Sequence, residues 1–412
     1  MRKRSILGIL GLAASLLSGH DLMAAVTYEA HPGLFTSYEY TDNYHGDIHG
    51  GKSDSIYYVG PSLELSCKAP SADIDFTGSY AKSFHQRFSE DDSPEIHLTS
   101  HASYTTTLQA TRLAYDFVRT LTRENLGEPF GEVKRNTGSI LYSLSLTQRT
   151  SMTAGYDIST ETWDVPSIEV APLNHEDVIF MGGNLGITHQ LNPLDTIMLT
   201  ARQDYYDYKI IQNVVETNGG LRFTHAFSPS FNLGIDTHYT HDDRGRDPNE
   251  DRYDASLIGQ YIFNQTTNMS VGGGYTWLIT EHLDRQSVYL ANATIEKNLK
   301  DDRFHLSVAK EFSAEFTTNR YGTYDTKSAS LIWDRQWLQT WSTSTRASIS
   351  DRKPTAGTPG LDETDTVLGF RVTWKPIEYF TSNIMYDHLQ SKYETSGTAR
   401  ENRYMMMIEV RY

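Results

Sequence analysis

One pattern runs along the chain from about residue 34. Segments of about ten to fourteen residues alternate apolar and polar side chains, and each segment ends in a turn. In one of them Ile74, Phe76 and Tyr80 form an apolar row, whereas Asp73 and Asp75 occupy alternate positions on the other face. A period of two predicts a β-strand with one apolar and one polar face. The segments are about twice as long as globular strands and match the roughly 9 to 11 tilted residues that cross a bilayer.

The connections between these segments alternate between short and long. Short turns are expected at Lys68–Ser71, Gln148–Thr150, Asn192–Pro193, Ser228–Pro229, Gln265–Thr267, Lys300–Asp302 and Pro376–Ile377. Longer polar loops are expected at Arg87–Glu95, Thr122–Arg135, Asp164–His175, Asp242–Asp251 and Asp351–Asp365. This asymmetry is typical of bacterial outer-membrane barrels, which have short periplasmic turns and longer external loops. The sequence therefore predicts an all-β fold, a transmembrane antiparallel β-barrel of about 20 strands (about 18 to 22) with both ends in the periplasm.

The first residues resemble a secretory signal. Arg2, Lys3 and Arg4 precede an apolar run, 6–17, that is too short for a membrane-spanning helix, and the small residues Ala24 and Ala25 follow. We therefore expect residues 1–25 to be a signal peptide and residues 26–412 to form a single outer-membrane barrel domain. No plug or passenger is expected, because only residues 26–33 separate the signal from the first strand.

The mean hydropathy of -0.50 would by itself suggest a soluble protein, such as a propeller or a sandwich. A membrane barrel gives the same average, because each strand is apolar on one face only. No motif recurs at the period of about 40 to 50 residues that propellers show. The alternation therefore favours the barrel, in the outer membrane of a Gram-negative cell.

The last nine residues form an amphipathic segment that ends on an aromatic side chain. Its apolar row is Tyr404, Met406, Ile408, Val410 and Tyr412. Outer-membrane barrels commonly end in such a strand, which their assembly machinery recognises. We expect this strand to close the barrel against the first one, which leaves no unpaired edge in lipid. The expected partners are thus outer-membrane lipid and the barrel-assembly machinery.

Polar residues of the strands are the candidates for lining the lumen. These are Glu39, Glu64, Asp73, Asp75, Arg112, Asp116, Asp157, Arg202, Arg222, Asp236, Arg371, Glu409 and Arg411. They could form a selectivity ladder for a charged or hydroxylated ligand. They could equally form a solvated lumen held by ordinary ion pairs.

Other residue patterns carry little chemistry. His97 and His101 share one expected inward face, and His238 and His241 lie at a strand end, but same-face spacing alone is weak evidence for a metal site. We expect no enzymatic activity, no catalytic residues, no metal and no cofactor. A net charge of -16 argues against a nucleic-acid partner, because phosphate binding needs a basic face. Aromatic residues near strand ends are expected to form interfacial girdles, namely Tyr38, Tyr40, Tyr205, Tyr206, Tyr208, Trp277 and Tyr386.

One stretch resembles a known group of proteins. Tyr40, Thr41, Asp42, Asn43 and Tyr44 are followed by 54–63, which includes Gly60-Pro61-Ser62-Leu63. The stretch is similar to the opening of outer-membrane barrels, of the β-barrel porin type, encoded with exopolysaccharide systems, including those associated with the PEP-CTERM/exosortase system. That group has a Pro-Gly-Leu step where this chain has Gly60-Pro61-Ser62-Leu63. The resemblance implies export of, or association with, a surface polysaccharide, and it brings no catalytic residues.

Three functions follow from these expectations. The first is a channel for exopolysaccharide secretion that works with periplasmic export partners. The second is a passive diffusion porin for small solutes. The third is a structural or adhesive barrel with a filled lumen. The longest expected loops, Thr122–Arg135 and Asp351–Asp365, are short for a loop that folds inward to narrow a wide pore.

Overall fold

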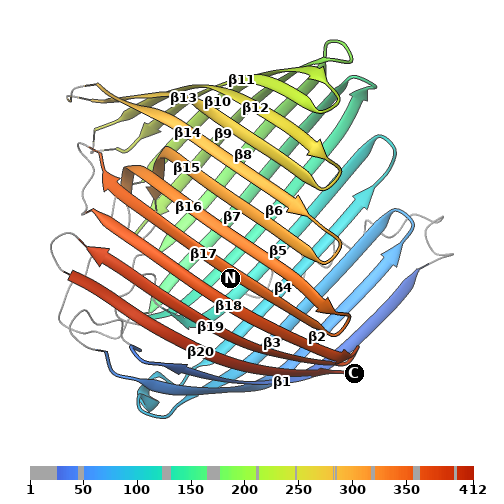
Figure 1. Ribbon diagram of the computed structural model, residues 1–412, viewed down its shortest axis with the longest axis vertical. Helices are drawn as coiled ribbons and strands as arrows, with labels where there is room; N and C mark the ends of the chain where they lie inside the picture. The colour runs from blue at the N-terminus through green and yellow to red at the C-terminus, as the bar shows by residue number, and fades with distance from the viewer. Residues whose placement is uncertain are drawn as a thin grey trace.

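The protein forms one closed sheet of twenty antiparallel strands (Figure 1). The computed structural model describes residues 26–44, 51–122, 131–164, 177–209, 213–245, 248–281, 283, 285–316, 321–355, 362–393 and 397–412. The strands are β1 Thr27–Thr41, β2 Asp54–Ala69, β3 Ala72–His85, β4 Pro94–Thr105, β5 Gln109–Thr122, β6 Gly131–Thr147, β7 Thr150–Asp164, β8 Val178–Gln190, β9 Asp195–Tyr208, β10 Val214–Ser228, β11 Phe231–Asp243, β12 Glu250–Asn264, β13 Thr267–Thr280, β14 Gln286–Asn298, β15 Asp302–Phe316, β16 Tyr321–Leu338, β17 Trp341–Pro354, β18 Glu363–Ile377, β19 Phe380–Tyr393 and β20 Gly397–Arg411. The predicted fold class and strand number are confirmed.

Each strand pairs with the next along the chain, and the ring closes between the last strand and the first. Residues Gly33 to Thr41 of β1 pair with Arg411 to Arg403 of β20. A closed ring satisfies every backbone N–H and C=O group within the sheet, which the hydrocarbon of a bilayer requires. The signal-peptide prediction lies outside the described residues.

The connections define two ends of the barrel. The inner end carries short turns such as that between Ala69 and Ala72. The outer end carries the longer connections, among them residues 86–93 with the 3-10 turn Ser89–Asp91. Several expected loops are partly strand, because β11 extends to Asp243 and β6 begins at Gly131. The turn expected at Pro376–Ile377 instead lies after Ile377, the last residue of β18.

The apolar side chains cover the outside of the ring. On most strands the outward-facing row includes large, apolar and exposed residues, for example Leu63, Ile158, Leu199, Leu257, Leu331 and Phe370. Such a continuous apolar exterior is far larger than the patches that water-soluble monomers expose, and it suits a lipid environment. No helix in the described part of the chain is both long enough and apolar enough to cross a membrane.

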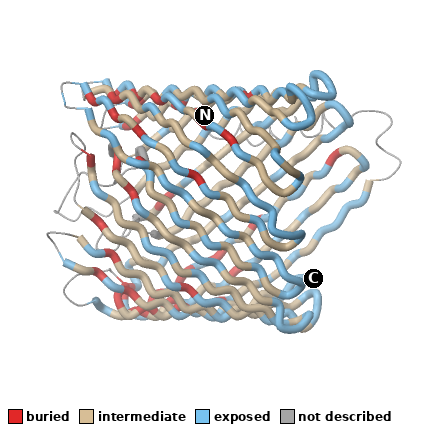
Figure 2. Tube along the Cα trace, turned by 45° about the horizontal axis from the view of Figure 1, so that its top comes forward, coloured by how far each residue is buried: buried red, intermediate tan, exposed pale blue. Residues whose placement is uncertain are grey.

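Buried residues gather at the outer end, and they are mostly polar (Figure 2). Asp54, Ser83, Glu250, Thr276 and Glu401 are each at most 3% exposed, and all lie near the outer ends of their strands. In a wide barrel, a strand side chain is normally exposed in part, either to the lumen or to the outside. A fully buried side chain is therefore one that other residues cover. The barrel is therefore more tightly packed at its outer end than at its inner end.

The β2–β3 pair shows one close approach that requires glycine. A Cβ atom on Gly60 would lie 1.7 Å from the carbonyl oxygen of Tyr80. Any larger residue would push the two strands apart. This glycine belongs to the Gly60-Pro61-Ser62-Leu63 step of the sequence resemblance, so its presence there has a packing reason.

Candidate functional site

The strand register fixes which side chains face the interior. In β1 the even-numbered Leu34 and Tyr38 are large, exposed and part of the apolar exterior, so the odd-numbered residues point inward. Carried strand by strand around the ring, the register places all thirteen candidates on the inward face: Glu39, Glu64, Asp73, Asp75, Arg112, Asp116, Asp157, Arg202, Arg222, Asp236, Arg371, Glu409 and Arg411. Their part in a selectivity ladder remains a prediction.

Many of these candidates form ion pairs along the wall. Near the inner end Arg411 lies 2.7 Å from Glu64 and 2.9 Å from Glu409. On the far side of the ring Arg222 lies 2.5 Å from Asp236. This pairing matches the alternative of a solvated lumen held by ion pairs.

The remaining candidates differ in their contacts. Arg202 lies 2.7 Å from Asp204 and 3.6 Å from Asp157. Asp116 accepts a hydrogen bond from the Thr99 hydroxyl at 3.0 Å. Other candidates border a shallow cavity of about 290 Å³ on the wall, namely Asp73, Asp75 and Arg112. The guanidinium of Arg371 lies 3.0 Å from the sulfur of Met385.

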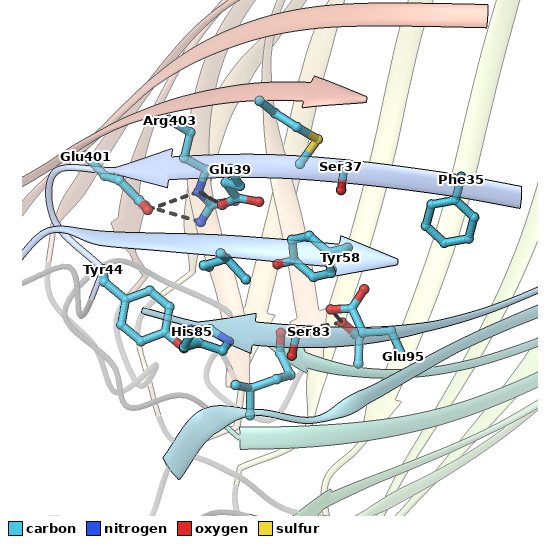
Figure 3. A pocket seen from close by; sticks show the side chains of 14 residues that line it. Phe35, Ser37, Glu39, Tyr44, Tyr58, Ser83, His85, Glu95, Glu401 and Arg403 are labelled. Carbon is cyan, nitrogen blue, oxygen red and sulfur yellow. Dashed lines mark hydrogen bonds and ion pairs between the residues drawn. The ribbon is translucent and has the colours of Figure 1, made fainter. Parts of the chain in front are cut away.

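A partly enclosed site lies beside the closing seam of the barrel. We call it the seam pocket, a cavity of about 280 Å³ lined by Glu39, Tyr58, His85, Glu95, Glu401 and Arg403 among others (Figure 3). Its walls come from β1, β2, β3, β4, β5 and β20. Strands from both ends of the sequence thus meet there, because the ring closes at β1 and β20.

An arginine is held between two glutamates on one wall of the seam pocket. The Arg403 guanidinium donates to the Glu401 carboxylate through Nε at 3.0 Å and Nη2 at 3.2 Å. Glu401 also accepts a hydrogen bond from Thr41 at 2.8 Å. The Arg403 Nε atom lies 3.7 Å from the Glu39 carboxylate, beyond hydrogen-bonding distance. Glu401 is therefore well satisfied, whereas Glu39 has a longer and weaker contact.

The opposite wall of the pocket adds a third carboxylate. Glu95 accepts a hydrogen bond from the Thr120 hydroxyl at 3.1 Å. Figure 3 shows the Glu95 side chain below Tyr58, across the cavity from the Arg403 side. With three carboxylates and one guanidinium, the seam pocket is electronegative.

The outer rim of the pocket is fixed by a buried pair. The His85 ring nitrogen Nδ1 lies 2.8 Å from the Asp54 carboxylate, and both side chains are almost fully buried. Asp54 also accepts the backbone N–H groups of Ser55 at 2.8 Å and Arg87 at 2.9 Å. Carboxylates with several such donors are strongly positioned. The start of β2 and the end of β3 are therefore held together.

Aromatic packing covers this rim. The Tyr44 ring stacks on Phe88 with centroids 5.1 Å apart and meets the edge of His85 at 5.2 Å. Burial, together with the charge and hydrogen bond of Asp91, raises the pKa of the Tyr44 phenol. Tyr44 thus stays neutral at physiological pH and acts as a packed cover over the pocket.

A second buried cluster lies at the outer end, where the β11–β12 hairpin meets β16. Arg244 lies 2.6 Å from Glu250 and 3.4 Å from Asp242. The Thr323 hydroxyl lies 2.5 Å from Glu250 and 3.2 Å from Arg244. Because β13, β14 and β15 separate the hairpin from β16 in the sheet, the hairpin leans across these three strands. We call these four residues the hairpin cluster.

Several sequence expectations meet a different arrangement in the structure. Tyr206 and Tyr208 point inward, since their register partners are the inward-facing Phe180 and Val178. The prediction that Tyr206 and Tyr208 belong to an interfacial girdle is therefore wrong. Because side chains alternate along β9, their neighbour Tyr205 lies on the opposite, outward face. His238 faces inward against Asp236 at 3.0 Å, whereas His241 faces outward and contacts Asp251 at 2.9 Å. The register places His97 and His101 on the inward face.

Sequence reasoning missed most of the seam pocket. Of its lining residues only Glu39 was among the candidates. Glu401 and Arg403 share the parity of Glu409 and Arg411 on β20, so the same alternation could have found them. Glu95 carries a weaker signal, because it lies at the start of β4, within the segment 87–95 that the sequence predicts to be a loop.

The comparisons with known proteins concern the fold. No protein-family model and no curated protein matches the sequence. The siderophore receptor PirA from Acinetobacter baumannii is similar in structure, with a TM-score of 0.53, 8% identity and coverage of 94% of this chain and 81% of that chain. A mutant of the ferric enterobactin receptor PfeA from Pseudomonas aeruginosa has a TM-score of 0.52, 10% identity and coverage of 93% and 80%. OpdL from Pseudomonas aeruginosa gives a TM-score of 0.41, 14% identity and coverage of 93% and 99%.

The fold and its surfaces define the class of protein. A closed antiparallel ring with an apolar exterior, a polar interior and short turns at one end is an outer-membrane β-barrel. The chain is therefore a protein of the bacterial outer membrane, and its fold is shared with receptors of that membrane. Its outer end faces the cell exterior, and its inner end faces the periplasm.

Proposed function

We propose that this barrel is a passive, water-filled channel that favours cations and neutral hydrophilic solutes over anions. The observation that carries the proposal is the closed ring of twenty strands with a polar inward face. Barrel diameter grows with strand number, and rings of about 16 to 18 strands already leave an aqueous channel. A ring of this size has room for water and solutes beside its wall side chains.

The preference for cations follows from the charges on that inward face. Along the described strands, inward-facing aspartates and glutamates outnumber inward-facing arginines and lysines. A low-dielectric wall focuses such an excess of one sign into the lumen. Rings of acidic side chains favour cations in channels. An acidic polymer would be repelled.

Conductance and ion selectivity test this function. The purified protein should form open channels in planar bilayers, and a KCl gradient should give a reversal potential on the cation side. Absence of conductance would instead indicate a structural or adhesive barrel with a filled lumen. An anion-selective channel would overturn the proposed preference.

Matched variants of neighbouring wall residues sharpen the selectivity test. Asp73 and Asp75 face the lumen on β3, and Lys68 pairs with Asp73 across β2. The double change Asp73→Asn and Asp75→Asn should move the reversal potential toward zero. Lys68→Gln should move it the other way, because it removes a positive charge from the same region.

A second candidate is a conduit for an uncharged polysaccharide, working with periplasmic export partners. The sequence resemblance over 40–44 and 54–63 favours it, and a twenty-strand ring offers the width. Liposome swelling separates the two functions. Entry of large neutral oligosaccharides would support the conduit, whereas a cutoff at small sugars would support a diffusion porin. Neighbouring genes for polysaccharide polymerases would also support the conduit.

A further inference from the structure

We propose that the seam pocket binds a small organic ammonium compound that also carries hydroxyl groups, with an amino sugar as the representative ligand. The proposal rests on the proposed channel function, since the ligand reaches the pocket from the lumen. It specifies where a solute pauses during passage and which solute chemistry is favoured.

The first argument is that the charged groups of the pocket differ in how well they are hydrogen-bonded. Arg403 and Glu401 satisfy each other through two hydrogen bonds. Glu39 is 8% exposed, lines the cavity and forms no hydrogen bond with any described residue. A buried carboxylate is costly unless it is paired and hydrogen-bonded. An ammonium group in the cavity would supply both the charge and the donors.

The second argument is a set of polar groups without partners. Ser37 is 8% exposed and lines the same cavity, and its hydroxyl has no hydrogen bond within the described ranges. The hydroxyl of Tyr58 also lines the cavity, again with no hydrogen-bond partner in that part of the chain. A ligand that displaces water from the cavity must replace its hydrogen bonds to these hydroxyl groups. Figure 3 shows Ser37 and Tyr58 beside Glu39, where hydroxyl groups of one ligand could reach them.

The size and walls of the pocket narrow the ligand class. A volume of about 280 Å³ is just below the range of small-molecule sites, which begins at about 300 Å³, so the ligand must be small. The rings of Phe35 and Tyr58 give apolar surfaces against which a sugar ring packs. Metal ions fit less well, because no cluster of at least three metal-ligating side chains occurs among the described residues. The excess of carboxylates opposes anions.

Channel block by glucosamine tests the proposal. Wild-type protein in planar bilayers should show a concentration-dependent loss of current with glucosamine, whose amine is charged at neutral pH. Glucose and N-acetylglucosamine are matched in ring chemistry but lack that charge, so they should block far less. Equal block by all three sugars would overturn the ammonium requirement.

Two variants separate the pocket from the rest of the lumen. Glu39→Gln should weaken the apparent glucosamine affinity about ten-fold or more, because it removes the charge that pairs with the ammonium. Glu296→Gln changes an inward-facing glutamate on β14, outside the pocket, and should leave the block unchanged. Equal weakening in both variants would mean that the overall lumen charge, and not the pocket, controls the block.

The two proposals can fail separately. Open-channel conductance without sugar reports the channel function, whereas glucosamine block reports the pocket. If the protein forms no channel, calorimetric titration of the detergent-solubilised barrel with glucosamine still measures the pocket, and no detectable heat would overturn it. If Glu39→Gln fails to fold, Ser37→Ala provides the second variant, with weaker binding expected and unchanged affinity counting against the site.

Discussion

The backbone N–H of Tyr412 donates to the carbonyl oxygen of Pro32 at 2.7 Å. The last residue of the chain is thus bonded to the first strand. Proline lacks an N–H group, so Pro32 can take part in the backbone hydrogen bonding between strands only through its carbonyl oxygen. The hydrogen bonding that closes the barrel therefore extends one residue beyond β20, which ends at Arg411.

Removal of residues 404–412 should prevent formation of a closed barrel. The truncation leaves β1 and β19 with unpaired N–H and C=O groups in lipid, where each costs several kcal/mol. The folded form should be lost in an assay of heat-dependent gel mobility after refolding into lipid vesicles. Tyr412→Ala is the control, because it keeps the backbone N–H and removes a side chain that is 91% exposed. A truncated chain that still migrates as a compact form would contradict the role of β20 in closure.

Charge placed on the lipid-facing surface should destabilise the barrel more than charge placed on the inward face. Leu331 and Ser330 are adjacent near the middle of β16, and Leu331 is an exposed residue of the apolar exterior. Leu331→Arg should lower the free energy of unfolding by about 2 to 4 kcal/mol, the cost of a basic residue near the bilayer midplane. Denaturant titration of the protein in lipid vesicles measures this change.

Ser330→Arg is the matched control for that substitution. Ser330 faces inward between Ser307 of β15 and Ser348 of β17, so a longer side chain can extend into the lumen. Its effect on the free energy of unfolding should be clearly smaller. If the two arginines cost the same, the assignment of the two faces of β16 is wrong.

The alternation that places Leu331 and Ser330 also explains how much of the fold is predictable. A strand has a period of two, so the apolar row of a single segment identifies both faces without knowledge of the neighbours. Alternation within their own strands is therefore enough to predict an inward face for Asp75 and Arg371. Tyr206 shows the limit of position alone, because a place near a strand end does not determine the face on which a side chain lies, whereas alternation does.

The seam pocket required information that alternation does not contain. Glu39, Glu95 and Arg403 lie on three strands that are far apart in sequence. Whether they share one height on the wall depends on the stagger between strands and on closure of the ring. A one-residue change of register would move a side chain to the opposite face, so the meeting of these groups can be read only from the pairing itself.

The Tyr44 cover should depend on its ring more than on its hydroxyl. Tyr44→Ala removes the stack on Phe88 and the edge contact with His85, and large buried aromatics cost about 3 to 5 kcal/mol when truncated. Tyr44→Phe keeps both ring contacts and should cost only about 1 kcal/mol. Hydrogen exchange at the amides of Tyr44 and Gln86 reports the change, because both donate to backbone carbonyls of this region. Equal loss of protection in both variants would assign the effect to the hydroxyl.

The hairpin cluster should behave as a buried ion pair whose members depend on each other. The side chains of Arg244 and Glu250 are 4% and 1% exposed, and 2.6 Å separates their charged atoms. Arg244→Met removes the positive charge that offsets the cost of burying the Glu250 carboxylate. Loss of one partner of a buried pair typically costs about 3 to 5 kcal/mol.

The test compares single and double variants by hydrogen exchange of the β11–β12 amides. Arg244→Met alone should sharply reduce protection of this hairpin. The double change Arg244→Met and Glu250→Gln should recover much of the loss, because removal of both charges also removes the desolvation cost. Additive effects of the two changes would show that Arg244 and Glu250 are not coupled. Recovery in the double variant would identify charge compensation, and not the shape of the arginine side chain, as what holds the hairpin against β16.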